Sequence, residues 1–131
     1  MLHQILIVDD EKEVRDTVRR QLGGTRFETL EADGAERAMQ LMNENALTVD
    51  VIICDVRMPK ITGIEAVDYF REKFPRTPII VLTGFPDLDL AVGFMKKGVV
   101  DYLVKPVEKD RLLVAVENAA GHHRVFDASG I

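Results

Sequence analysis

The feature that most constrains the fold of this 131-residue sequence is an alternation of short apolar runs with segments of helical periodicity. Runs rich in Val, Ile and Leu are typical of strands buried on both faces, and we expect strands at residues 4–8, 27–31, 49–54, 79–82 and 102–104. Between these runs, apolar residues recur every three or four positions. That spacing predicts helices at residues 11–22, 35–42, 64–74, 87–97 and 108–120.

This alternation predicts an α/β fold in which a five-stranded parallel sheet is covered by helices on both faces, because right-handed crossovers place them there. The length fits one domain, which we expect at residues 1–121. Residues 122–131 lose the apolar periodicity, so we interpret them as a C-terminal tail or the start of a linker.

Composition excludes several functions for this domain. The net charge of −5 argues against direct binding of a nucleic-acid backbone, which needs a clustered basic face. We expect no membrane partner, because no apolar run is long enough to span a bilayer and no signal peptide is recognisable. The single cysteine, Cys54, lies inside an apolar run, which fits a cytoplasmic location with reduced thiols.

Polar residues collect where the predicted strands end. Asp9 and Asp10 follow the first strand, Asp55 follows the third, Thr83 follows the fourth, and Lys105 follows the fifth. The carboxyl ends of parallel strands lie at one edge of a sheet, which is where open α/β sheets bind ligands. We therefore expect these side chains to converge if the first and third strands are neighbours.

Three carboxylates at short range repel one another, and one lysine cannot balance them, so a divalent cation is the expected partner. Oxygen ligands without histidine or cysteine favour Mg²⁺. A bound cation and the ammonium of Lys105 would together favour an incoming phosphoryl group, which the hydroxyl of Thr83 could also contact. The sequence contains neither GxGxxG after its first strand nor GxxxxGK[ST], which argues against a nucleotide as the phosphate source.

Four motifs in the chain resemble those of response-regulator receiver domains in two-component signalling, over about residues 3–120. They are ILIVDDE at 5–11, DVRMP at 55–59 followed by Gly63, IVLTG at 80–84, and DYLVKP at 101–106. Taken singly, the acidic residues could cap a helix or occupy a turn. The four motifs occur in the family's order, each at a strand end, and this combination makes the resemblance specific.

The resemblance implies the flavodoxin-like doubly wound strand order 2-1-3-4-5 and a phosphorylation-dependent signalling switch. Asp55 would accept a phosphoryl group from a histidine kinase. Mg²⁺, for which Mn²⁺ is expected to substitute, would be held by Asp9, Asp10, Asp55 and the backbone carbonyl of Arg57. Lys105 would pair with the phosphoryl oxygens. The domain would be an autocatalytic phosphoacceptor that dephosphorylates itself, and not an enzyme that turns over external substrates.

The resemblance also implies how the signal leaves the site. Thr83 would move toward the phosphoryl group and Tyr102 would rotate inward behind it, changing the surface of the fourth helix, fifth strand and fifth helix. That surface would bind an effector domain, a downstream protein or a second copy of the chain. We expect Phe94, Val99 and Val100 to be partly exposed near it. The Lys105–Pro106 bond is expected to be cis.

Two other functions remain open from the residues alone. A haloacid-dehalogenase-type phosphatase also uses an aspartyl nucleophile, but it needs a second Asp two positions later, where this chain has Arg57. Turnover of p-nitrophenyl phosphate would reveal it. An interaction domain that is never phosphorylated would keep the fold, and a failure to bind Mg²⁺ would favour it.

Overall fold

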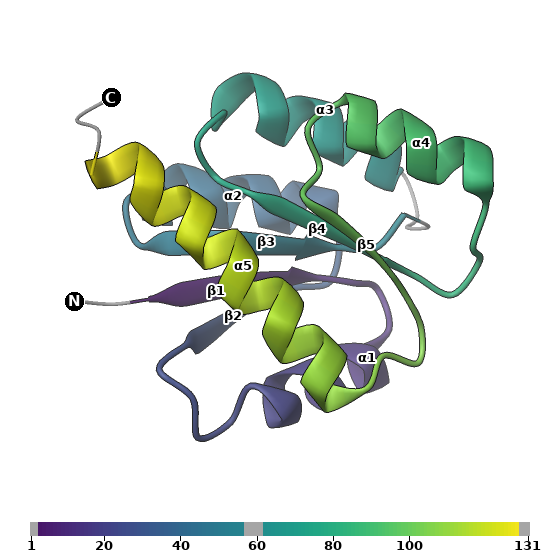
Figure 1. The fold of residues 1–131 in the computed structure, drawn as a ribbon, viewed down its shortest axis with the longest axis horizontal. Coiled ribbons are helices and arrows are strands. Elements are labelled where there is room, and N and C mark those ends of the chain that lie inside the picture. Colours follow the sequence, from purple (N-terminus) through teal and green to yellow (C-terminus); the bar gives the residue numbers. More distant parts are fainter. Residues whose placement is uncertain (1–2, 57–61, 129–131) are drawn as a thin grey trace.

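The computed structural model of this chain describes residues 3–56 and 62–128, with side chains as far as Gly121. Five strands alternate with five helices in the described residues (Figure 1). The strands are β1 (Gln4–Val8), β2 (Glu28–Ala32), β3 (Val49–Cys54), β4 (Ile79–Thr83) and β5 (Asp101–Val104). The helices are α1 (Lys12–Gln21), α2 (Ala35–Asn45), α3 (Gly63–Lys73), α4 (Leu88–Lys96) and α5 (Lys109–Ala128).

The strands form one parallel sheet in the order β2-β1-β3-β4-β5. This result confirms the predicted fold class and strand order. In the register of the sheet, the last residue of β1, Val8, lies opposite Cys54 of β3 and Ala32 of β2. The chain therefore leaves the ends of these strands side by side, at one edge of the sheet.

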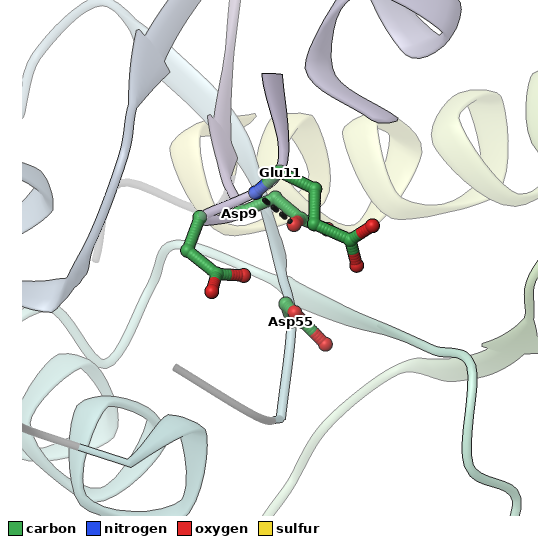
Figure 2. Close-up of side chains that lie close together, drawn as sticks. Asp9, Glu11 and Asp55 are labelled. Atoms are coloured by element: carbon green, nitrogen blue, oxygen red, sulfur yellow. Dashed lines mark hydrogen bonds between the residues drawn. The ribbon is translucent and has the colours of Figure 1, made fainter. Parts of the chain in front are cut away.

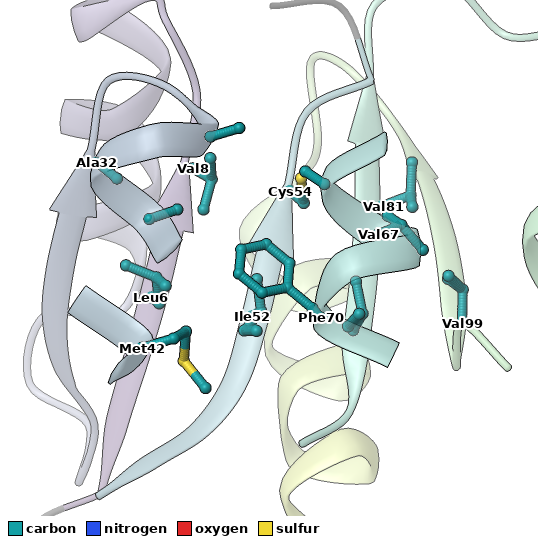
Figure 3. Packing of buried hydrophobic residues seen from close by; sticks show 14 of the residues in the cluster. Leu6, Val8, Ala32, Met42, Ile52, Cys54, Val67, Phe70, Val81 and Val99 are labelled. Carbon is teal, nitrogen blue, oxygen red and sulfur yellow. The ribbon is translucent and has the colours of Figure 1, made fainter. Parts of the chain in front are cut away.

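Two apolar cores lie on the two faces of the sheet. Alternate residues of each central strand enter opposite cores: Ile5 and Ile7 of β1 pack with α1 and α5, whereas Leu6 and Val8 pack with α2 and α3. Figure 3 shows the second core, in which the ring of Phe70 from α3 lies over the sheet. Because both faces are covered, the central strands are apolar throughout, as the sequence pattern predicted.

Helix α4 and the turn after it differ from the prediction in which apolar residues face solvent. Phe94 and Val99 are buried, so the prediction of partial exposure is wrong for them, while Val100 is half-buried as predicted. The apolar residues that lie in solvent on this helix are Leu88, Val92 and Met95. A short helix that covers the edge strand can turn only one apolar stripe inward, and here that stripe contains the large ring of Phe94.

Helix α5 is longer than predicted. It continues past Ala120 to Ala128, so its expected end was wrong. Gly121 weakens a helix without ending it, and no proline follows it in the sequence. The boundary between the domain and a tail at residue 121 stays a prediction. No helix in the part of the chain that the structure describes is long and apolar enough to cross a membrane.

Gly63 allows the start of α3 to lie directly against the backbone that follows β3. Its amide donates to the carbonyl of Val56 at 2.8 Å. A β-carbon at this position would overlap the carbonyl oxygen of Asp55 and the α-carbon of Val56, and would lie 2.7 Å from the carbonyl oxygen of Val56. The motif therefore needs glycine here for close approach of two backbone segments.

We predict that Gly63→Ala lowers the free energy of unfolding by roughly 1–3 kcal/mol, because backbone atoms must move to make room for the methyl group. Gly93→Ala is the matched control, since nothing lies within 4 Å of its β-carbon position inside α4. This control should be neutral, or stabilise the protein by up to about 1 kcal/mol. Urea unfolding measures both, and equal effects of the two substitutions would contradict the close approach.

Candidate functional site

Backbone hydrogen bonds extend the sheet one residue beyond its strands and thereby position the polar side chains. The amide of Asp9 donates to the carbonyl of Ala32 at 3.1 Å, and that of Asp55 donates to the carbonyl of Val8 at 2.9 Å. The amide of Lys105 donates to the carbonyl of Thr83 at 2.7 Å. Asp9, Asp55 and Thr83 are buried, because they still lie between the helices that cover the sheet.

Four carboxylates gather at this edge. Asp9, Asp10, Glu11 and Asp55 each offer one oxygen atom, and these oxygens all lie within 4.8 Å of one another. Figure 2 shows Asp9 and Glu11 at the end of β1 facing Asp55 at the end of β3. The structure thus brings together the three aspartates that the sequence placed here, and we name the four residues the acidic cluster.

Glu11 is the member of the acidic cluster that the sequence analysis missed. Its backbone amide donates to Oδ1 of Asp9 at 2.9 Å, which closes the turn between β1 and α1. The side chain is largely exposed and reaches back over the site. Its position directly after the two aspartates was the available signal, but sequence alone does not show which way a turn directs its side chains.

Lys105 lies among the carboxylates. Its Nζ atom is 2.8 Å from Oδ2 of Asp9, 3.4 Å from Oδ2 of Asp55 and 3.7 Å from Oε1 of Glu11. Burial opposes the charged ammonium, but the hydrogen bond that the ammonium donates to Asp9 and the negative charges of Asp9 and Asp55 outweigh it, so the pKa of Lys105 is raised. The ammonium therefore stays protonated. The Lys105–Pro106 bond is cis, as expected from the resemblance.

Among the residues that the structure describes, Lys105 is the one cation that pairs with these carboxylates, so negative charge is in excess. The clustered oxygens are the hard ligands that Mg²⁺ prefers, so the residues present fit such an ion. Asp9, Asp10 and Asp55 are the protein side chains expected to hold it. The fourth predicted ligand, the backbone carbonyl of Arg57, lies outside the described residues.

Thr83 at the end of β4 and Tyr102 in β5 both contact the loop that follows β4. The hydroxyl oxygen of Thr83 accepts a hydrogen bond from the amide of Phe85 at 3.0 Å. The hydroxyl oxygen of Tyr102 accepts one from the amide of Asp87 at 3.3 Å, and its ring lies 6.5 Å from that of Phe94. These contacts link both residues to the start of α4.

Comparisons with known proteins agree with this geometry. The family model of the response regulator receiver domain matches residues 5–117. The regulatory protein AtoC of Escherichia coli is 35% identical over 90% of this chain, and the DNA-binding transcriptional regulator NtrC of Escherichia coli is 34% identical over 92% of it. The chain spans about a quarter of the length of each of these relatives.

The fold comparison gives the same result. A crystal structure of a response regulator receiver domain protein from Clostridium thermocellum matches with a TM-score of 0.89 and 33% identity, over 95% of this chain and 99% of the other. This chain belongs to the response regulator receiver domain family, the signalling domains of two-component systems.

The electrostatics of Asp9 give a pH-dependent prediction. Burial raises the pKa of Asp9 above its ordinary value of 3.8, against the lowering effects of Lys105 and the Glu11 amide. A carboxyl group whose pKa rises on folding destabilises the folded state once it is ionised. Its cost is absent below the ordinary value and grows as the pH rises through the raised one.

We therefore expect Asp9→Asn to be more stable than the wild type near neutral pH in EDTA, and to lose this advantage as the pH falls toward 3.8. Urea unfolding at several pH values, with the metal chelated throughout, measures the difference. A variant less stable than the wild type near neutral pH would show that the ion pair with Lys105 outweighs the cost of burying Asp9.

Proposed function

We propose that Asp55 accepts a phosphoryl group from a histidine kinase in a Mg²⁺-dependent reaction, and that this modification changes the surface formed by α4, β5 and α5. The observation that carries the proposal is the position of Asp55. Its carboxylate lies within the acidic cluster and 3.4 Å from the ammonium of Lys105, at the edge of the sheet where ligands bind.

The reaction uses the carboxylate of Asp55 as the nucleophile. One of its oxygens forms a bond to phosphorus while the bond from phosphorus to the donor nitrogen breaks, and the electron pair stays on the histidine ring. A bound Mg²⁺, or Mn²⁺ in its place, would supply positive charge to the phosphoryl oxygens. Asp9, Asp10 and the carbonyl of Arg57 would hold that ion together with Asp55.

Lys105 and Thr83 would contact the oxygens of the phosphoryl group once it is on Asp55. The ammonium of Lys105 is already close to Asp55, so it can pair with a phosphoryl oxygen without a large movement. The hydroxyl of Thr83 accepts from the Phe85 amide, which leaves its own proton free to be donated to another phosphoryl oxygen. The same site hydrolyses its own acyl phosphate, and it does not turn over external substrates.

The signal passes through the loop between β4 and α4. Movement of Thr83 and Tyr102 would change their hydrogen bonds to Phe85 and Asp87 and would shift the start of α4. An effector domain, a downstream protein or a second copy of the chain would bind there. This domain has no role in contacting nucleic acid or membrane, and its single unpaired cysteine fits a cytoplasmic location.

The central test is phosphorylation by acetyl phosphate in the presence of Mg²⁺. We expect the wild type to gain one phosphoryl group by intact-mass spectrometry and Asp55→Asn to gain none. Asp50→Asn is the matched control, because Asp50 is a buried carboxylate of the same strand that contacts His3 at the opposite end. Stoichiometric labelling of Asp55→Asn would show that the acceptor lies elsewhere.

The exposed apolar residues of α4 and β5 allow a test of the output surface. Val92 and Met95 on α4 and Val104 on β5 are 45%, 50% and 45% exposed. We expect beryllofluoride with Mg²⁺ to convert the chain to a dimer, and Val92→Lys to prevent this, because a charge would be buried in the interface.

Leu47→Lys is the control for this substitution, since Leu47 is 97% exposed between α2 and β3, away from the output surface. Light scattering coupled to size-exclusion chromatography measures the mass of each variant. A mass unchanged by beryllofluoride would contradict dimerisation through this surface and favour an effector as the partner.

A further inference from the structure

Arg15 reaches the backbone of the acidic cluster from α1 while its own side chain contacts none of the four carboxylates. Its Nη1 atom donates to the carbonyl oxygen of Asp9 at 2.8 Å, and its Nε atom donates to Oε1 of Glu31 at 3.3 Å. The side chain is only 15% exposed. The guanidinium therefore forms a bridge between the end of β1 and the neighbouring strand β2.

Asp9 is held at all four of its hydrogen-bonding groups. Its amide donates to Ala32, its Oδ1 accepts from the Glu11 amide, and its Oδ2 accepts from Lys105. Arg15 supplies the fourth contact, to the carbonyl oxygen. The same contact also affects the orientation of Asp10.

The carbonyl of Asp9 and the amide of Asp10 belong to one planar peptide unit. Holding the carbonyl oxygen therefore sets the orientation of the plane from which the Asp10 side chain departs. Asp10 itself is exposed, so packing does little to fix it. The direction of its carboxylate depends on the peptide that Arg15 holds.

The charge of Arg15 is balanced locally. Glu31 pairs with Arg15 through one carboxylate oxygen and with Arg19 through the other, at 2.9 Å. Arg15 thus contacts the backbone of the acidic cluster at Asp9. Its positive charge is offset by Glu31, which lies outside the cluster. The position of the Arg15 side chain would favour cation binding, whereas its positive charge would oppose it. Because the two effects have opposite signs, a binding experiment can separate them.

We propose that Arg15 is a positioning residue for the divalent-cation site: it fixes the Asp9–Asp10 peptide so that the carboxylates of Asp9, Asp10 and Asp55 converge on one ion. This inference rests on the proposed function and concerns the affinity of the site for its ion. If Arg15 acted only through its charge, its removal would strengthen cation binding. If it acts by position, its removal weakens binding.

The direct test is Mn²⁺ binding to the 131-residue chain, followed by the electron paramagnetic resonance signal of free Mn²⁺, with Mg²⁺ as competitor. We expect Arg15→Gln to weaken binding of both ions about tenfold, the lower end of the effect of groups that orient metal ligands. Arg19→Gln is the matched control. It removes the same charge from the same Glu31 partner but makes no contact with Asp9, and its affinity should equal that of the wild type.

A second measurement separates positioning from a general loss of structure. In acetyl phosphate labelling, Arg15→Gln should need more Mg²⁺ for half-maximal rate and reach the wild-type rate at saturating Mg²⁺. Tighter or unchanged Mn²⁺ binding by Arg15→Gln, or a maximal rate that excess Mg²⁺ does not restore, would overturn the proposal.

Arg15→Lys provides a further comparison should the glutamine variant fail to fold. Lysine keeps the charge but cannot bridge Asp9 and Glu31 as a guanidinium does, so the Mn²⁺ affinity of Arg15→Lys should be lower than that of the wild type. A Mn²⁺ affinity of Arg15→Lys equal to that of the wild type would show that the guanidinium bridge is not needed and would overturn the proposal.

The two proposals fail in different ways. A wild-type chain that binds no Mn²⁺, or that is not labelled on Asp55, would contradict the proposed function itself. A wild-type chain that binds Mn²⁺ and is labelled on Asp55, alongside an Arg15→Gln variant of equal affinity, would contradict the role of Arg15 alone.

Discussion

Burial of β1, β3 and β4 on both faces is the constraint on which the remaining structure depends. Side chains of these strands meet a helix whichever way they point, so a polar group placed mid-strand would lose its contact with water. Polar residues are therefore confined to the ends of the strands: Gln4 and Asp50 where the strands begin, and Asp9 and Asp55 where the chain leaves them. Because the sheet is parallel, the carboxyl ends of all its strands lie at one edge, and the candidate site residues are concentrated there.

The electrostatic state of that edge is unfavourable in the absence of a cation. Within the described part of the chain, the four clustered carboxylates have Lys105 as their one close cation, and burial raises the pKa of Asp9. In the proposed function, this charge imbalance is what would attract a divalent ion to the site. Such an exchange of stability for function is common at binding sites.

Helix α4 is held by polar contacts at both ends and by apolar packing between them. At its start, the amides of Phe85 and Asp87 donate to the hydroxyls of Thr83 and Tyr102. At its end, the Nε atom of Arg71 donates to the carbonyl of Lys97, which lies after the last helical residue. Between these points, one apolar stripe packs inward around Phe94 and the other faces solvent. In the proposed function, a change in the hydrogen bonds of the loop between β4 and α4 would reposition this exposed apolar surface while the central sheet stays unchanged.

The sequence by itself determined the fold class, the strand order once the motifs were matched, and the convergence of Asp9, Asp10, Asp55 and Lys105. These follow from periodicity and from position relative to strand ends, which are local properties of a chain. Tertiary structure alone decided that Glu11 turns back over the aspartates, that Gly63 lies against the Asp55 backbone, and that α4 buries Phe94 while exposing Val92. It also brought Arg15 to the carbonyl of Asp9. Each of these depends on which of two surfaces a helix or turn presents to a neighbour, and that choice is made only when the elements pack together.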